Sequence, residues 1–215
     1  MNDHTREEQI PDLSAAALRE WSRHIEGVMR GVAHSLNNRA AALSAVIELS
    51  KDATTDDTAA IASILGTELD RVQSLAAIVR SLGPPRSGIE AFSPHEAVKE
   101  ALAVLGLHGE HRERPVTIDA SSAPPTRVPR WMFVRSLIAL GAAASHGVGG
   151  KVPVHIAVVG EGQWVVARVN GTNAAAVHPS PYAAELARAM GGEMLESRDG
   201  FRVPSLAALR QREGP

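Results

Sequence analysis

The sequence contains no cysteine and few aromatic residues. Among its 215 residues are three Trp, three Phe and one Tyr. Without cysteine the chain has no disulfide, no thiolate zinc site, no iron–sulfur cluster and no cysteine nucleophile. The few aromatic residues, together with 35 alanines, favour closely packed helices over an all-β sandwich.

A strong charge and a long apolar run are also missing. The 22 Lys and Arg residues against 24 Asp and Glu give a formal charge of −2, which argues against nucleic acid as the main partner. No stretch approaches the roughly 18 apolar residues of a membrane-spanning helix, and the polar start at 1–12 is unlike a secretory signal. We therefore expect a cytoplasmic protein that binds neither nucleic acid nor membranes.

Two long helices are predicted after a flexible tail at 1–13. Ser14 is a good N-cap, and the first helix runs to about Asp52, with single glycines as its only interruptions. Residues 54–57 predict a turn and a second N-cap, and Gly83 with the following prolines ends the second helix. Apolar residues recur every three or four positions. They are Leu18, Trp21, Ile25, Val28, Val32 and Leu36 in the first helix, and Ile61, Leu65, Val72, Leu75, Val79 and Leu82 in the second.

The apolar stripes of this hairpin, residues 14–83, need a partner. Two helices alone cannot cover such stripes on both sides. We expect two copies of the chain to form a four-helix bundle, which makes the protein a homodimer. The alternative is that the hairpin packs only on the rest of its own chain.

The remainder of the chain mixes helices and strands. After a linker at 84–88, helix signals with prolines and caps fall at 94–105, 129–147 and 182–190. Alternating apolar residues predict strands at 116–119, 152–159, 163–169, 194–196 and 201–203, with a hairpin turn at 160–162. The predicted fold is therefore α+β, a helical hairpin followed by an α/β sandwich at 89–215.

His34 differs from the other eight histidines in its setting. It lies about 160° around the helix from Val32 and Leu36 and so faces solvent. Four neighbours share its face: Arg30 at i−4, Asn37 and Asn38 at i+3 and i+4, and Ala41 at i+7. A neutral imidazole can attack phosphorus, and a cation and amides can hold phosphoryl oxygens. The alternative is an ordinary exposed histidine without a function.

The segment around His34 resembles the phosphoacceptor box of sensor histidine kinases. In that box His is followed by an acidic residue, Leu, Asn-Asn and Pro, and here Val32-Ala33-His34-Ser35-Leu36-Asn37-Asn38 is similar to it. The hairpin and the α/β part resemble that family's dimerisation domain and ATP-binding domain over roughly 14–206. Two residues depart from the box: Ser35 replaces the acid that the resemblance implies as a general base, and Arg39 replaces the proline.

The ATP-binding motifs of that family are absent from the α/β part. On its pattern Ala139 and Ala143 stand where kinases carry the asparagines for magnesium and triphosphate, and a methyl group coordinates nothing. Asn170 replaces the adenine-binding aspartate, and residues 174–181 contain no glycine where a glycine loop belongs. Residues 185–197, in contrast, still resemble the helix-to-strand framework of that family. This combination is similar to histidine phosphotransferases built on a degenerate kinase frame.

We therefore expect a histidine phosphotransferase of a two-component phosphorelay. His34 would carry a phosphoryl group between the aspartates of response-regulator receiver domains, with Arg30, Asn37, Asn38 and Ala41 orienting it or docking the receiver. The chain would need no cofactor or metal of its own, since the receiver supplies Mg²⁺. Two alternatives stay open: a divergent kinase that autophosphorylates with ATP, and a non-catalytic pseudokinase that binds a receiver.

Other candidate sites are weaker. His108 and His111 are three residues apart and could bind a metal, but no third ligand is near them, which favours a solvated loop. Trp21, Trp131 and Trp164 occupy apolar positions, which indicates a role in packing rather than in base stacking.

Overall fold

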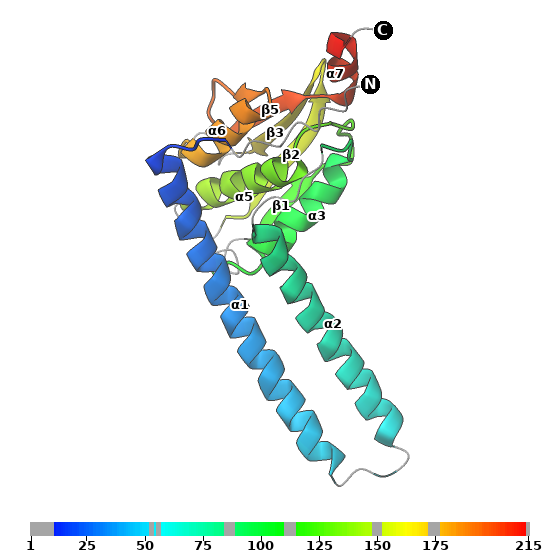
Figure 1. The fold of residues 1–215 in the computed structure, drawn as a ribbon. Helices are drawn as coiled ribbons and strands as arrows, with labels where there is room; N and C mark the ends of the chain where they lie inside the picture. The colour runs from blue at the N-terminus through cyan, green and yellow to red at the C-terminus, as the bar shows by residue number, and fades with distance from the viewer. Residues whose placement is uncertain are drawn as a thin grey trace.

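The computed structural model describes residues 11–51, 54, 57–83, 89–109, 115–147, 152–171 and 177–213. The predicted linker at 84–88 and His111 lie outside these ranges. A long helical hairpin extends from a sheet that is covered by helices (Figure 1). This arrangement confirms the predicted α+β fold.

The hairpin consists of α1 (Ala15–Ser50) and α2 (Thr58–Leu82). Ser14 caps α1 as predicted, because its Oγ accepts a hydrogen bond from the N–H of Ala17 at 3.2 Å. The helix continues without a break through Arg39, where the kinase box has proline. Gly83 follows the last turn of α2.

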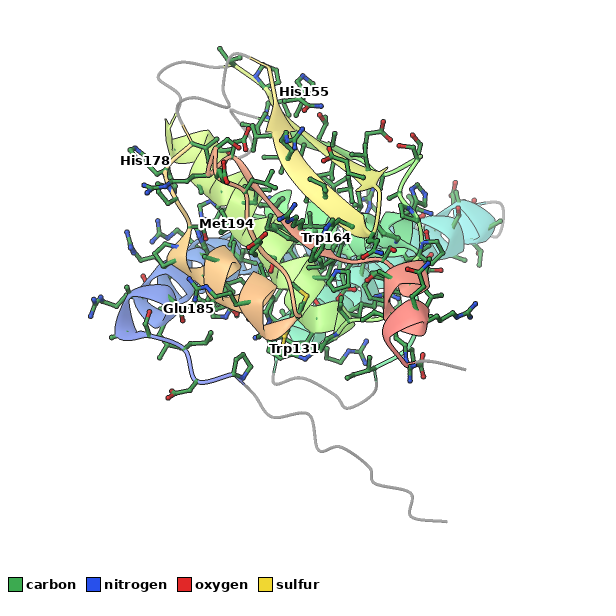
Figure 2. All side chains as sticks on the ribbon, turned by 90° about the horizontal axis from the view of Figure 1, so that it is seen from above. Trp131, His155, Trp164, His178, Glu185 and Met194 are labelled. Atoms are coloured by element: carbon green, nitrogen blue, oxygen red, sulfur yellow. The ribbon has the colours of Figure 1, made fainter. Side chains whose placement is uncertain are left out.

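The first half of α1 packs on the α/β part of the chain. Trp21 stacks on Tyr182 of α6 (Pro181–Ala189), with ring centroids 4.7 Å apart and planes 7° apart. Glu185 of the same helix lies beside the start of α1 and accepts hydrogen bonds from N and Oγ of Ser14, at 2.8 and 2.6 Å (Figure 2). Leu18 and Leu36, which the periodicity places in a helix–helix seam, are 51% and 41% exposed in the single chain.

The sheet has five strands in the order β1-β2-β3-β5-β4. Their bounds are β1 Val116–Asp119, β2 Val154–Glu161, β3 Trp164–Asn170, β4 Glu193–Met194 and β5 Gly200–Pro204. β1 runs parallel to β2, and the other pairs are antiparallel. Gly162 adopts a φ of +60° in the β2–β3 turn, a conformation that favours glycine.

Helices α3 (Pro94–Leu105), α5 (Arg130–Gly147) and α6 cover one face of this sheet (Figure 1). Phe133 of α5 is fully buried between Phe92 and Phe201, with edge contacts at 5.7 and 5.8 Å between ring centroids. A last helix, α7 (Leu206–Glu213), was not predicted from the sequence. No helix within the described ranges is both long and apolar enough to cross a membrane.

Arg135 of α5 joins the hairpin to the α/β part. Its guanidinium lies 5.0 Å from the ring centroids of both Trp21 and Trp131. It also donates hydrogen bonds to the carbonyl oxygens of Leu82 and Gly83 at the end of α2, at 2.9 and 2.6 Å. A cation held between two indoles therefore binds the last carbonyls of α2, which satisfies acceptors that the helix leaves free.

Candidate functional site

His34 is exposed on α1 and lines a groove of about 560 Å³. The groove has two walls, one from α1 and one from the turn that follows α3. The α1 wall consists of Arg23, Glu26, Gly27, Arg30, Gly31 and His34, and the turn contributes His108 and Gly109. The predicted nucleophile thus faces solvent beside a depression that could receive part of another protein.

Asn38 fixes the ring of His34. Its Nδ2 lies 3.2 Å from Nε2 of His34, one helical turn away. With the amide nitrogen as the donor, Nε2 is the acceptor, so the neutral ring carries its proton on Nδ1. The lone pair available for attack is therefore on Nε2.

The structure brings together some of the predicted site residues and not others. Arg30 is exposed and lines the groove with His34, and no carboxylate among the described residues forms an ion pair with it. Asn37 and Ala41 are exposed on α1 but do not line the groove. The local cluster consists of His34, Asn38 and Arg30.

Two glycines of α1 bring the second wall close to the helix. A Cβ on Gly31 would overlap the carbonyl oxygen of Leu107, and a Cβ on Gly27 would overlap the ring of His108. Gly31 is buried in this contact. Sequence reasoning treated these glycines as interruptions, yet their spacing of four places them on one helix face, which is a signal of close backbone approach.

His108 is not part of a solvated loop. It is 8% exposed and packs against α1, so the prediction of a solvated loop is wrong for this residue. His108 is buried because the glycines of α1 let the turn approach the helix closely. The sequence around His108 contains no local pattern that predicts this burial. Within the described part of the chain, no group of three or more His, Asp or Glu side chains could hold a metal ion.

An ion cluster around the buried carboxylate of Glu68 lies next to the His34 site. Arg39, which follows Asn38, donates to both carboxylate oxygens of Glu68 on α2, at 3.2 and 3.0 Å, and Arg71 also binds Glu68. Glu68 is only 5% exposed. Burial raises the pKa of its carboxyl group, but the hydrogen bonds and charges of Arg39 and Arg71 outweigh burial and hold that pKa below the ordinary value. Glu68 therefore stays ionised and links the two helices.

Three positions that the resemblance compares with nucleotide-binding residues lie on α5 and at the end of β3. Ala139 and Ala143 lie on α5, at 0% and 7% exposure. Asn170 is exposed at the end of β3. Two buried methyl groups on α5 can coordinate neither magnesium nor phosphate.

No protein-family model matches the sequence, and no curated protein sequence matches it. Among solved structures, the chain is similar to the histidine kinase AdeS of Acinetobacter baumannii, with 14% identity and a TM-score of 0.42, covering 80% of this chain and 98% of that chain. It is also similar to a bacterial phosphotransferase, with 13% identity and a TM-score of 0.37, covering 90% of this chain and 98% of that one. At these values the chemistry has to be argued from this chain's own residues.

Proposed function

We propose that the chain is a homodimeric histidine phosphotransferase that relays a phosphoryl group between receiver domains through His34. The observation that carries this function is the setting of His34 on α1. Its ring is exposed at a groove, Asn38 places the lone pair on Nε2, and Arg30 lines the same groove.

The transfer is a displacement at phosphorus. Nε2 of His34 attacks the phosphorus of a receiver aspartyl phosphate, the N–P bond forms, and the P–O bond to the aspartate breaks with its electron pair on the departing carboxylate. Arg30 stabilises the phosphoryl oxygens during this step. The reverse reaction on a second receiver completes the relay. The receiver's acidic site supplies Mg²⁺, which neutralises charge on the phosphoryl group.

Two features favour transfer between receivers over autophosphorylation with ATP. Ser35 provides no carboxylate beside His34 to act as a general base. Ala139 and Ala143 provide no ligand for magnesium triphosphate. Transfer from a receiver needs neither group, because the receiver brings its own metal and leaving group.

The exposed apolar residues of the hairpin support the homodimer. Along α1 and α2, Leu36, Ile47, Leu49, Ile64, Leu65, Leu69 and Val79 are between 37% and 69% exposed. These residues extend along both helices, so a partner that covers them has to be a hairpin of similar length. A second copy of the chain supplies such a hairpin and completes a four-helix bundle.

Transfer of labelled phosphate from phosphorylated receiver domains tests the role of His34. We expect His34→Gln to lose the label completely, while His95→Gln, at an exposed histidine of α3, keeps it. Unchanged transfer by His34→Gln would overturn the proposal. Stable label from ATP without a receiver would favour the kinase, and tight receiver binding without any transfer would favour the binding module.

The homodimer has its own test. We expect Leu69→Glu, which puts a charge in the exposed apolar stripe of α2, to convert a dimer into a monomer in light scattering and sedimentation. Val152→Glu changes a residue of similar exposure, 44% against 55%, outside the hairpin and serves as the control. A wild-type chain that is monomeric at high micromolar concentration would contradict the dimer.

A further inference from the structure

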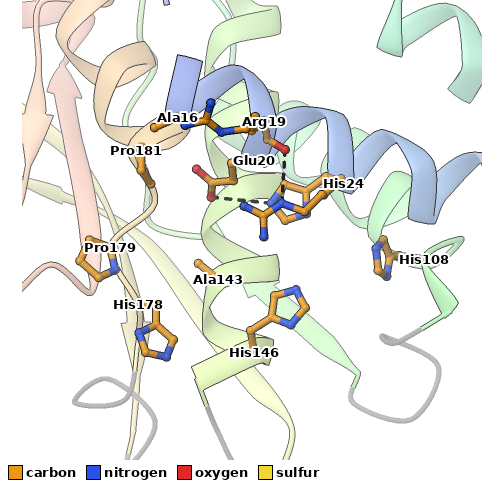
Figure 3. A pocket seen from close by; sticks show the side chains of 11 residues that line it. Ala16, Arg19, Glu20, His24, His108, Ala143, His146, His178, Pro179 and Pro181 are labelled. Carbon is orange, nitrogen blue, oxygen red and sulfur yellow. Dashed lines mark hydrogen bonds and ion pairs between the residues drawn. The ribbon is translucent and has the colours of Figure 1, made fainter. Parts of the chain in front are cut away.

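A second cavity adjoins the His34 groove and has no role in the proposed phosphotransfer. Its volume is about 540 Å³, within the range of small-molecule sites, which is about 300–1,000 Å³. It lies between the first half of α1, the end of α5 and the segment before α6 (Figure 3). Arg23 and His108 line both the cavity and the groove, so the two spaces are neighbours along α1.

Basic side chains dominate the walls of this cavity. They are Arg19, Arg23, His24, His108, His146 and His178, against a single carboxylate, that of Glu20. Arg19 and Arg23 are exposed, and among the described residues neither forms an ion pair with a carboxylate. Arg23 uses its Nε to donate to the carbonyl oxygen of Arg19 at 3.3 Å, which leaves the end of its guanidinium for another acceptor.

The charge of Glu20 is already engaged within the fold. Its Oε2 accepts the N–H of Tyr182 at 2.9 Å, in the first turn of α6. Burial raises the pKa of Glu20, but the interaction with His24 and the hydrogen bonds from Tyr182 and Ser180 outweigh burial and hold that pKa below its ordinary value. Glu20 thus acts as an internal anion at the N-terminus of α6 and does not neutralise the arginines.

His24 provides a second, independent sign of a ligand. It is 6% exposed, lines the cavity, and its Nε2 has no hydrogen-bond partner among the described residues. Oε1 of Glu20 lies 3.7 Å from this nitrogen, which is an ion-pair contact but longer than a hydrogen bond. This long contact with Glu20 leaves Nε2 of His24 without a close hydrogen bond, and an oxygen atom of a bound molecule would supply one.

We propose that this cavity binds a small molecule bearing a phosphate or a similar oxyanion, held by Arg19 and Arg23 and hydrogen-bonded by His24. A metal ion does not fit, because the described residues contain no group with the arrangement of metal ligands. The volume exceeds the needs of a single phosphate ion, so the remainder accommodates the body of a phosphomonoester. Anion binding here needs no chemistry at His34.

Calorimetric titration of the full chain, at constant ionic strength set with chloride, tests this site. The probes are inorganic phosphate and ribose 5-phosphate. We expect saturable binding of one ligand per chain and about tenfold weaker binding for Arg19→Gln, since a charge-assisted hydrogen bond is lost. Tighter binding of ribose 5-phosphate than of phosphate identifies a phosphomonoester as the ligand, and equal binding identifies the free ion.

Arg210→Gln, at an exposed arginine of α7 away from the cavity, is the matched control and should bind like the wild type. His24→Asn should also weaken binding, and its melting temperature shows whether the buried substitution alters the fold. Absence of saturable binding, or equal effects of Arg19→Gln and Arg210→Gln, would overturn the site. His34→Gln should bind both probes normally, which separates this site from the phosphotransfer proposal.

Discussion

Asn38 lies one turn beyond His34 on α1 and donates from Nδ2 to Nε2 of its ring over 3.2 Å. Because an amide nitrogen has no lone pair to offer, this contact assigns the acceptor role to Nε2 and the proton to Nδ1. In the proposed phosphotransfer, this hydrogen bond would select Nε2 as the nitrogen that attacks phosphorus. Asn38 would then have to release Nε2 when a phosphoryl group arrives.

Replacing Asn38 with Asp should slow phosphoryl transfer by about tenfold, since a carboxylate accepts a hydrogen bond from a protonated Nε2 and so favours the tautomer whose lone pair is on Nδ1. Asn37→Asp is the matched control, because it adds the same charge at an exposed neighbour that, among the described residues, forms no hydrogen bond with the ring. Rates of transfer from a phosphorylated receiver, and the tautomer seen by ¹⁵N NMR, measure the effect. Equal rates for the two variants would mean that charge, not the tautomer, controls transfer.

Gly31→Ala should destabilise the chain by roughly 1–3 kcal/mol, because the new Cβ overlaps the backbone carbonyl of Leu107, which cannot rotate away. Gly66→Ala, in the middle of α2 with open space around it, should instead stabilise the chain by about 0.5–1 kcal/mol through helix propensity. Urea denaturation compares the two. A stabilised Gly31→Ala would show that the turn after α3 does not press on α1.

Arg135→Lys should cost about 2–4 kcal/mol, since an ammonium group cannot stack between Trp21 and Trp131 and also reach two carbonyl oxygens. Arg130→Lys is the control: Arg130 is 44% exposed, with ion pairs to Glu96 and Glu100, and its loss should cost under about 1 kcal/mol. Denaturation with tryptophan fluorescence reads both the stability and the indole environment. Similar costs for both variants would contradict the role of Arg135 as a connector.

The Glu68 cluster should make the stability of the hairpin depend on acid pH. The pKa of Glu68 in the folded chain is lowered from its ordinary value of 4.5, so its contribution to stability is fully present above about pH 4.5 and is lost as the pH falls through the folded pKa. Glu68→Gln should therefore be less stable than the wild type at pH 7, and the difference should shrink below pH 4.5. Glu48→Gln, which removes an exposed pair with Lys51, should show little effect at either pH. A difference independent of pH would contradict this assignment.

The ends of the helices could be predicted because their signals are local. Ser14, Ser93 and Gly83 lie where caps and breakers require, and α3 has the bounds that the sequence indicates. α7 was missed because its sequence, LAALRQRE, is apolar only in its first half and buries little beyond Ala208. Without an apolar stripe over several turns, periodicity cannot identify a helix.

The candidate site was half predictable for a similar reason. Exposure of His34 and its contact with Asn38 follow from the geometry of a single helix. The opposite wall, with His108 and Gly109, comes from a distant part of the chain and depends on a backbone contact that only packing reveals. At position 39 the sequence pattern shows only that Arg39 replaces a proline. In the structure, Arg39 forms an ion pair with Glu68 across the hairpin.

The close contact of Gly27 and Gly31 with the turn after α3 has a consequence for how such a protein can change over generations. A chain that exchanged its α/β part for another by recombination would keep His34 and Asn38, but it would lose the turn at 106–109 that completes the groove. The glycines would then face solvent and only weaken the helix. The hairpin and the residues after α3 therefore have to be inherited together for the groove beside His34 to be preserved.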